Sequence, residues 1–385
     1  MSAKRSFTKY IAGFIVAALF FGALYKVHSQ ERFVYNRLGG PSNLKFEKAR
    51  IEAVVSESIA PDEKVEGLVR GTQDLKIKIL TGTHAGEQHI VKNYLSARFN
   101  VYGVEGKTII VCVDTAPNGN VRFTVNSYYR SPVLLAAMVL FALTLAIIGG
   151  KKGLRSVIGL GFTLVCVLFL FIPMLVQGQS PVFSSIFIAV LTSVVTIVCI
   201  NGWSAKTTAA ILGTALGVVI AGLLSTMFGA LGHVSGFHTE EAETLILIAS
   251  TTGMNVGQLL FSGILIASLG AVMDTAVSIS AGVHEVLMTS PSLSRKRLFQ
   301  SGMNMGRDIM GSMSNTLILA FAGTSVNSLI LIYAYNVNTT QLINLDAVGI
   351  ELLRGLCGST AVVLTVPLVS LISAWMFPLV LQKKD

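Results

Sequence analysis

Long apolar runs separated by short polar segments cover most of this chain, and most of the runs have the length of a membrane-spanning helix. A helix needs about 20 apolar residues to cross the hydrocarbon core of a bilayer. On this basis we predict about eight spans, at residues 10–25, 132–148, 157–176, 182–200, 207–228, 259–283, 315–335 and 357–381. The sequence therefore predicts an α-helical polytopic membrane protein.

One segment follows a different pattern, because apolar and polar residues alternate there with a period of two. This alternation at 49–55, 75–79 and 121–125 indicates half-buried strands, and 109–113 indicates a buried strand. Residues typical of turns lie at Gly71, at Thr81 and Gly82, at Gly106 and at 117–119. About five short strands favour a small closed barrel, with the oligonucleotide/oligosaccharide-binding (OB) barrel as one candidate.

These patterns divide the chain into an N-terminal membrane anchor at 1–28, an all-β domain at 29–130 and a helical transmembrane domain at 131–385. The first part is either an uncleaved anchor or a cleavable signal that ends at Val27-His28-Ser29. We favour the anchor, because no small-x-small motif directly follows the apolar run. The β domain lacks an aromatic platform for bases, so we expect no nucleic-acid partner and favour a structural cap or a partner-docking module.

Composition and charge support the membrane class. Only 13% of the 385 residues are charged, whereas soluble domains are about a quarter charged. The net charge of +9 has a topological explanation, because the basic residues of the short loops, apart from Arg354 in the last outer loop, fall on one side if both termini are cytoplasmic. This orientation makes the β domain extracytoplasmic and the cell membrane the expected location. The basic residues are Lys4, Arg5, Lys9, Lys151, Lys152, Arg155, Lys206, Arg295, Lys296, Arg297, Arg307, Lys383 and Lys384.

Asp274 lies inside the apolar run 259–283 and is the leading candidate for chemistry. A charge at mid-bilayer depth costs roughly 2.5–3.5 kcal/mol on insertion scales, so it usually marks a pathway, a relay or a pairing site. On a helix, Ser278 lies one turn along on the same side, and Glu285 returns to that side. The three residues form a polar stripe that leads from the interior towards the cytoplasm.

A second set of polar residues comes just before or at the start of the next span and includes Arg307, Asp308 and Asn315. Two interpretations are open. In the first, the two sets form a relay for protons or cations between the two helices. In the second, Asp274 pairs with Arg307 or with the Asn315 amide and locks the helices together.

The loop before the Asp274 span is a weaker candidate, because it contains histidines and glutamates that could hold a divalent metal. They are His233, His238, Glu240, Glu241 and Glu243. A solvated acidic loop is the alternative, and no second set of ligands is evident. We predict no cofactor and no enzymatic activity, because the chain has no nucleotide loop, zinc-protease motif or nucleophile elbow.

Three smaller features predict local structure. Residues 245–250 are apolar but too short to span, which favours a re-entrant or interfacial piece. Gly213 and Gly217 form a G-x-x-x-G step, which lets helices approach closely. Only one of the four cysteines, Cys112, falls in the β domain, so no disulfide is expected there.

Two of these stretches resemble a known family. The segment 268–285, followed by 306–320, closely resembles the YibE/F-like family of multi-pass membrane proteins. In the β domain, Thr81-Gly82-x-x-x-Gly86 and Asn93 fit the same pattern. The resemblance runs from the anchor through the last span and implies the multi-pass architecture.

The order of elements is also similar to one half of a resistance-nodulation-division permease or of the SecD/SecF translocation proteins. Gly270-Ala271-Val272-Met273-Asp274 matches their Gly-x-x-x-Asp step, 291–307 their cytoplasmic helix, and 314–317 the start of their next span. This resemblance implies that Asp274 couples proton movement to work done by the outer domain. It also implies a second copy or a sister subunit.

Three functions are compatible with these patterns. The first is a transporter, or a membrane machine coupled to the proton gradient, with Asp274 as the carrier. The second is a non-transport scaffold or assembly factor that binds a partner through its outer β domain. The third is a metal-responsive or metal-transporting protein that uses the His233–Glu243 loop. The expected partners are the lipid bilayer and a homo-oligomer or paired membrane subunit, and the scarcity of charge in the spans favours apolar or amphipathic cargo.

Overall fold

The computed structural model describes residues 18, 20–29, 44–97, 99–116, 119–335 and 338–382. The chain forms two compact units, Val34–Thr144 and Met1–Phe33 with Leu145–Asp385. The boundary after Thr144 falls inside a helix, whereas the sequence patterns divided the chain after residue 130. Most of the predicted first span lies outside the described residues, although residues 20–28 are helical.

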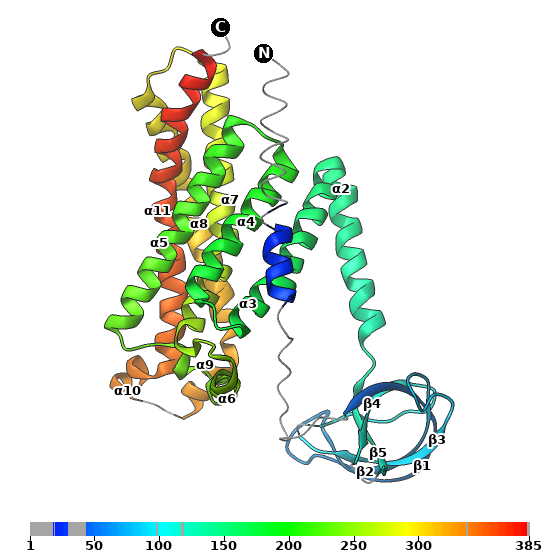
Figure 1. Cartoon of the computed structure of the whole chain (residues 1–385). Helices are drawn as coiled ribbons and strands as arrows, with labels where there is room; N and C mark the ends of the chain where they lie inside the picture. The colour runs from blue at the N-terminus through cyan, green and yellow to red at the C-terminus, as the bar shows by residue number, and fades with distance from the viewer. Residues whose placement is uncertain are drawn as a thin grey trace. The chain divides into compact units, whose positions relative to one another are not determined.

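The first unit contains an antiparallel sheet that curls around one apolar core (Figure 1). Its strands are β1 (Lys45–Pro61), β2 (Val69–Ile79), β3 (Gln88–Leu95), β4 (Thr108–Thr115) and β5 (Val121–Tyr128). Their order in the sheet is β3-β2-β1-β4-β5. Ile51, Leu75 and Ile109 are fully buried in the core. The predicted all-β segment is confirmed, with the four predicted strands inside β1, β2, β4 and β5.

Strand β3 is absent from the sequence prediction because its residues do not alternate simply between apolar and polar. Its buried side includes the amide of Asn93, and its exposed side carries Ile90 and Tyr94. Asn93 Nδ2 donates to Val101 O at 2.7 Å and to Gln73 Oε1 at 3.2 Å. A polar side chain therefore occupies a core position because the backbone of a neighbouring loop accepts its hydrogen bond.

Gly71, which we predicted to supply a turn, lies inside β2 with a φ of 131°. A Cβ at this position would lie 2.0 Å from the carbonyl oxygen of Ser58, on the paired strand β1. The predicted turn is therefore wrong, and glycine is required here because two strands approach closely. Gly82 and Gly106, at φ 79° and 81°, do lie between strands.

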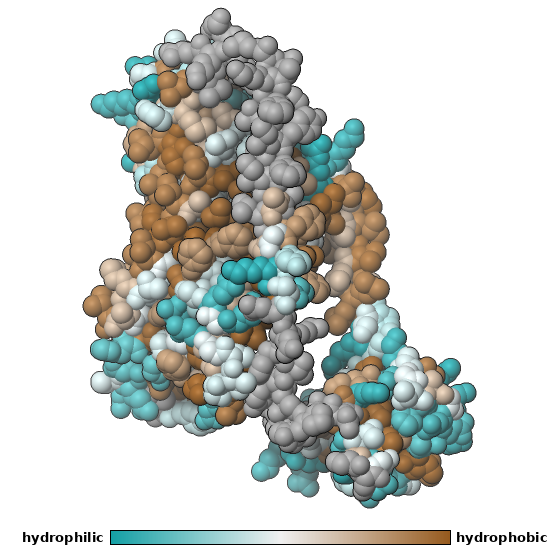
Figure 2. Space-filling model, in the orientation of Figure 1, coloured by the Kyte–Doolittle hydropathy of each residue, from teal (hydrophilic) through white to brown (hydrophobic). Residues whose placement is uncertain are grey.

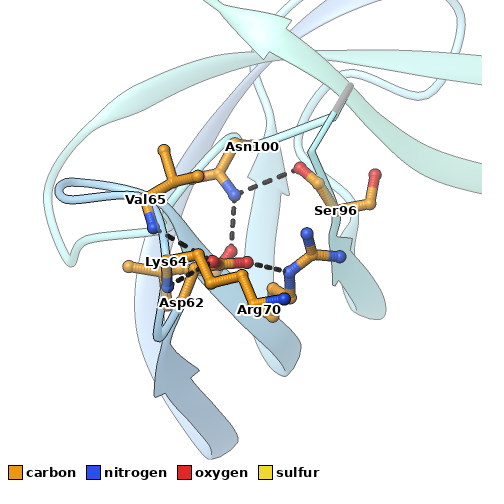
Figure 3. Close-up of polar contacts among 7 residues, drawn as sticks. Asp62, Lys64, Val65, Arg70, Ser96 and Asn100 are labelled. Carbon is orange, nitrogen blue, oxygen red and sulfur yellow. Dashed lines mark hydrogen bonds and ion pairs between the residues drawn. The ribbon is translucent and has the colours of Figure 1, made fainter.

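The loop between β1 and β2 is ordered by the carboxylate of Asp62 (Figure 3). This carboxylate accepts hydrogen bonds from the backbone N–H groups of Lys64 at 3.0 Å and Val65 at 3.1 Å, and from Arg70 Nε. The Arg70 hydrogen bond is the largest of the effects that hold the pKa of Asp62 below its ordinary value. Side-chain bonds thus fix a loop that has no strand partner.

The second unit is a bundle of long helices (Figure 1). Its elements are α2 (Ser131–Cys166), which crosses the unit boundary, η1 (Val167–Phe171), α3 (Ile172–Val176), α4 (Pro181–Asn201), α5 (Ala205–Leu231), η2 (Gly236–His238), α6 (Ala242–Thr252), η3 (Val256–Gln258), α7 (Leu259–Thr289), α8 (Arg295–Thr324), α9 (Val326–Ala334), α10 (Thr339–Asn344) and α11 (Asp346–Gln382). Apolar residues cover the middle of the unit and polar residues gather at both ends (Figure 2). An apolar surface in this position is the one that a bilayer contacts.

Five helices in the described residues are long and apolar enough to cross a membrane, or six if α8 and α9 count as one span bent by 63°. The predicted spans 132–148 and 157–176 lie in one helical stretch, which breaks at Gly150 (φ 54°). The predicted span 315–335 covers the end of α8, the break and α9. The multi-pass architecture is therefore confirmed, while the count of eight stays a prediction. The short apolar helix α6 matches the piece predicted to be too short to span.

Helices α5, α7, α8 and α11 pack through small residues. A Cβ on Gly213 of α5 would lie 2.1 Å from Val369 Cγ2 of α11, and one on Gly217 would lie 2.3 Å from Thr365 Oγ1. The close approach predicted from the G-x-x-x-G step is confirmed. Gly302 and Gly306 of α8 contact α11 in the same way.

Candidate functional site

Asp274 is the middle residue of α7, and its side chain is exposed on the surface of the helical unit. The opposite side of α7 is buried, where Val272, Ala276 and Ile279 pack in apolar clusters with α5 and α11. This buried side packs against α4, α5, α8 and α11, and it also includes the small polar residues Ser268, Thr275 and Ser280. The exposed side is where the charge lies.

Asp274 belongs to a row of small and polar residues that we call the α7 face. The row consists of Gly263, Ala267, Gly270, Asp274, Ser278, Ala281 and Glu285, all of them exposed. Their spacing of three or four residues keeps them on one side of the helix. A Cβ added at Gly263 or Gly270 would meet no atom within 4 Å. The predicted polar stripe is therefore present, but it faces outward.

Helix α8 carries a similar row, which we call the α8 face. It consists of Asn304, Arg307, Asp308, Gly311, Ser312 and Asn315, all of them exposed. The two helices pack on each other, since a Cβ on Gly282 would lie 2.5 Å from Met305 Sδ. The predicted relay residues thus lie on exposed faces of two adjoining helices and not in the apolar interior. Helical periodicity shows that such residues lie on one side of a helix, but it does not show whether that side is buried or exposed.

The contacts of these residues bear on the proposed helix lock. Arg307 Nη1 donates to Asn304 Oδ1, on its own helix, at 3.2 Å. Among the residues that the structure describes, no hydrogen bond or ion pair connects Asp274 to Arg307 or Asn315. A lock within one copy of the chain therefore gains no support.

The loop of the weaker metal candidates is folded by its own polar contacts. The backbone N–H of Ser235 donates to His238 Nδ1 at 3.2 Å, and His233 takes a left-handed conformation with a φ of 54°. Within the described ranges, no three His, Cys, Asp or Glu side chains are grouped so that they could hold a metal ion. The metal prediction gains no support from this geometry.

Several pairs of titratable residues are not among those predicted from the sequence. In the β domain, Glu87 accepts hydrogen bonds from His89 at 2.8 Å and His84 at 3.1 Å, and these bonds hold the pKa of Glu87 below its ordinary value. In the helical unit, Arg354 Nη1 donates to Glu351 Oε1 at 2.7 Å. The i,i+3 spacing of Glu351 and Arg354 on a helix is the sequence signal from which this ion pair could have been predicted.

Apolar helices of spanning length, with an apolar surface over their middle, define a multi-pass integral membrane protein. The family model of the YibE/F-like proteins matches residues 137–379, so the chain belongs to the YibE/F-like family. The matched segment includes both the α7 face and the α8 face. No curated protein matches the chain. No solved structure matches it either.

Proposed function

We propose that this protein is a transporter, or a membrane machine, that is coupled to the proton gradient across the cell membrane through Asp274. One observation carries the proposal: an ionisable side chain is exposed in the middle of a helix of spanning length. A carboxylate at this depth is costly, whereas a protonated carboxyl is neutral and costs much less. Proton binding would therefore let this side of α7 face an apolar environment. Proton release would make a polar environment more favourable for it.

A second copy of the chain, or a paired membrane subunit, is the partner that we propose for the α7 face. Lipid tails offer no hydrogen bonds to Asp274 or Ser278, and small residues such as Ala267 and Gly270 let a neighbouring helix approach closely. The α8 face of another copy could supply the donors, because Ser312 and Asn315 are exposed on it. This arrangement would also give the proton a protected site between two subunits.

The topology that we propose follows the basic loops, with both termini cytoplasmic and the β domain extracytoplasmic. For the β domain we propose a barrel of the OB type. Strand β1 pairs with both β2 and β4, and the sheet curls, which fits a five-stranded and partly open barrel. We propose no enzymatic activity and no nucleic-acid partner.

Proton movement through reconstituted protein tests the role of Asp274. Liposomes with a trapped pH-sensitive dye would be exposed to an acid pulse, with a potassium diffusion potential to draw protons inward. We expect acidification with the natural chain and its loss with Asp274→Asn, while Asp114→Asn, which removes an exposed carboxylate from β4, leaves the rate unchanged. Equal rates for the natural chain and Asp274→Asn would overturn the proposal.

The alternative function, a scaffold or assembly factor, is favoured by one feature of the β domain. Strand β3 lies at one end of the sheet order, and its exposed side carries Ile90 and Tyr94, which are 66% and 63% exposed. Apolar residues on such a strand are typical of a surface that binds another chain. If Ile90→Lys with Tyr94→Lys abolishes function in cells while Asp274→Asn does not, the scaffold is the better proposal.

A further inference from the structure

The β domain is joined to the bilayer by a very short link. Strand β5 ends at Tyr128 and α2 begins at Ser131, so only two residues separate the sheet from a helix of spanning length (Figure 1). The 20 residues from Ser131 to Gly150 include no charged side chain, and Lys151 follows them. At a rise of about 1.5 Å per residue this stretch is about 30 Å long, which is the thickness of the hydrocarbon core. Arg130 therefore lies at the level of the lipid head groups, and the end of β5 lies beside it.

Basic side chains of the sheet adjoin this link. Lys48 Nζ lies 4.6 Å from the centroid of the Tyr129 ring, and the backbone N–H of Tyr129 donates to Thr108 O at 3.4 Å. Thr108 of β4 is opposite Arg50 of β1, and Arg50 is in turn opposite Lys78 of β2. Because neighbouring strands are about 4.8 Å apart, Arg50 is two strands, or about 10 Å, from the link. We call the following four residues the basic band: Lys48, Arg50, Lys78 and Arg130.

The basic band has no anionic partner in the part of the chain that the structure describes, since none of its four cations takes part in an ion pair there. The nearby carboxylates of β1 are engaged elsewhere: Glu47 accepts a hydrogen bond from the loop between β2 and β3, and Glu52 lies 3.5 Å from Lys76 Nζ. Arg50 and Lys78 are both exposed and lie directly opposite each other. Like charges at opposite positions of a sheet are unfavourable, so the band favours an anionic ligand.

We propose that the basic band binds the head groups of anionic phospholipids and so holds the β domain against the membrane surface. A lipid is the ligand, and not a soluble anion, because the band adjoins the start of a spanning helix. The aromatic residues of the link support this choice: Tyr128 and Tyr129 are half-buried, and Arg130 Cζ lies 5.8 Å from the centroid of the Tyr128 ring. Tyrosine is enriched where a protein crosses the membrane–water interface. The proposal depends neither on Asp274 nor on which side of the membrane the β domain occupies.

Quenching of a single tryptophan by brominated lipid measures which lipid lies beside the basic band. The two native tryptophans, Trp203 and Trp375, would be replaced by Phe. Leu134→Trp would then place the reporter one turn into α2, at a side chain that is 60% exposed. The full chain would be reconstituted in phosphatidylcholine with increasing fractions of phosphatidylglycerol that is brominated near the head-group end of its acyl chains. The quenching curve gives the binding constant of phosphatidylglycerol relative to phosphatidylcholine at the reporter.

We expect phosphatidylglycerol to be favoured at this reporter, and Arg50→Gln with Lys78→Gln to lower the preference at least about fivefold, which is the effect of one basic residue near an anionic surface. Both side chains are exposed and unpaired among the described residues, so their replacement should leave the fold intact. Arg122→Gln is the matched control, because it removes an exposed cation from the other end of β5. A reporter at Ile147→Trp, near the other end of the same helical arm, should not respond to the double substitution.

Equal binding of the two lipids at the Leu134→Trp reporter would overturn the proposal, and so would a preference that survives Arg50→Gln with Lys78→Gln. Inorganic phosphate distinguishes a lipid from a free anion. If phosphate abolishes the preference while sodium chloride at equal ionic strength does not, the band binds a free phosphate and the membrane proposal is wrong. Asp274→Asn should abolish proton movement and leave the lipid preference unchanged, so failure of one proposal is distinguishable from failure of the other.

Discussion

Gly213 of α5 lies so close to Val369 of α11 that an added Cβ would come within 2.1 Å of the valine side chain. Both residues lie at buried positions, and α5, α7 and α11 form one cluster around them. The interhelical contact therefore depends on the absence of a side chain at one position. Such contacts hold helices together in a bilayer, where lipid tails are as apolar as the helices themselves.

From this contact we predict that Gly213→Val destabilises the helical unit. Overpacking of a tight contact typically costs about 1–3 kcal/mol, so the variant should unfold at a lower SDS fraction in mixed micelles. Gly161 of α2 offers the matched control, because a Cβ there meets nothing within 4 Å. If Gly161→Val is as destabilising as Gly213→Val, the effect would come from valine in a helix and not from the contact.

The buried amide of Asn93 gives a prediction for the β domain. Replacement by Leu leaves the carbonyl oxygen of Val101 without the Asn93 donor, while the side-chain oxygen of Gln73 keeps the backbone N–H of Gly103. Loss of a buried partner costs about 1–3 kcal/mol, so Asn93→Leu should speed hydrogen exchange in β2, β3 and the 99–104 loop. Lys92→Ala, on the exposed side of the same strand, should not. Equal exchange in both variants would contradict a structural role for the amide.

The sequence predicts the strands of this protein where the alternation of apolar and polar residues directly reflects which side chains are buried. Ile51, Leu75 and Ile77 alternate with polar residues, and the strands that contain them were predictable. Asn93 breaks the alternation because its partner, Val101 O, comes from a loop that no pattern reveals. Gly71 was mistaken for a turn residue because a close strand contact and a turn can both require glycine.

The candidate site shows the same limit in the membrane unit. Periodicity correctly put Asp274, Ser278 and Glu285 on one side of a helix. It could not show that this side is exposed, because that depends on where α5 and α11 pack. Tertiary contacts decide which side of such a helix is exposed.

The loop that Asp62 holds should loosen in acid. The pKa of Asp62 is lowered in the folded chain, chiefly by the Arg70 hydrogen bond, and an unperturbed Asp titrates at about 3.9. The stabilisation is therefore complete above the unfolded pKa and is lost as the pH falls through the lower folded pKa. Hydrogen exchange at Lys64 and Val65, corrected for the intrinsic effect of pH, should become faster only in that acidic range. In Asp62→Asn it should be fast at neutral pH as well, and slow exchange there would contradict the role of the carboxylate.

The α7 face gives the sharpest test of whether two copies of the chain meet there. A disulfide requires Cα atoms within about 7 Å, so single cysteines at Ala267 and Ser278 should cross-link two copies if this face lies near a twofold axis. The four native cysteines would first be replaced, since all are free thiols. Leu223 of α5 provides the control, because it is exposed but lies on another helix.

We expect an oxidant to form dimers from the Ala267→Cys and Ser278→Cys chains in native membranes, and none from Leu223→Cys. Dimers formed equally from all three would indicate random collision, which would argue against a specific interface. Dimers confined to the α7 face would give Asp274 a neighbour outside its own chain. In that case Asp274 is exposed in one copy of the chain because the second copy covers it. The small residues around this carboxylate favour such a close approach of another helix.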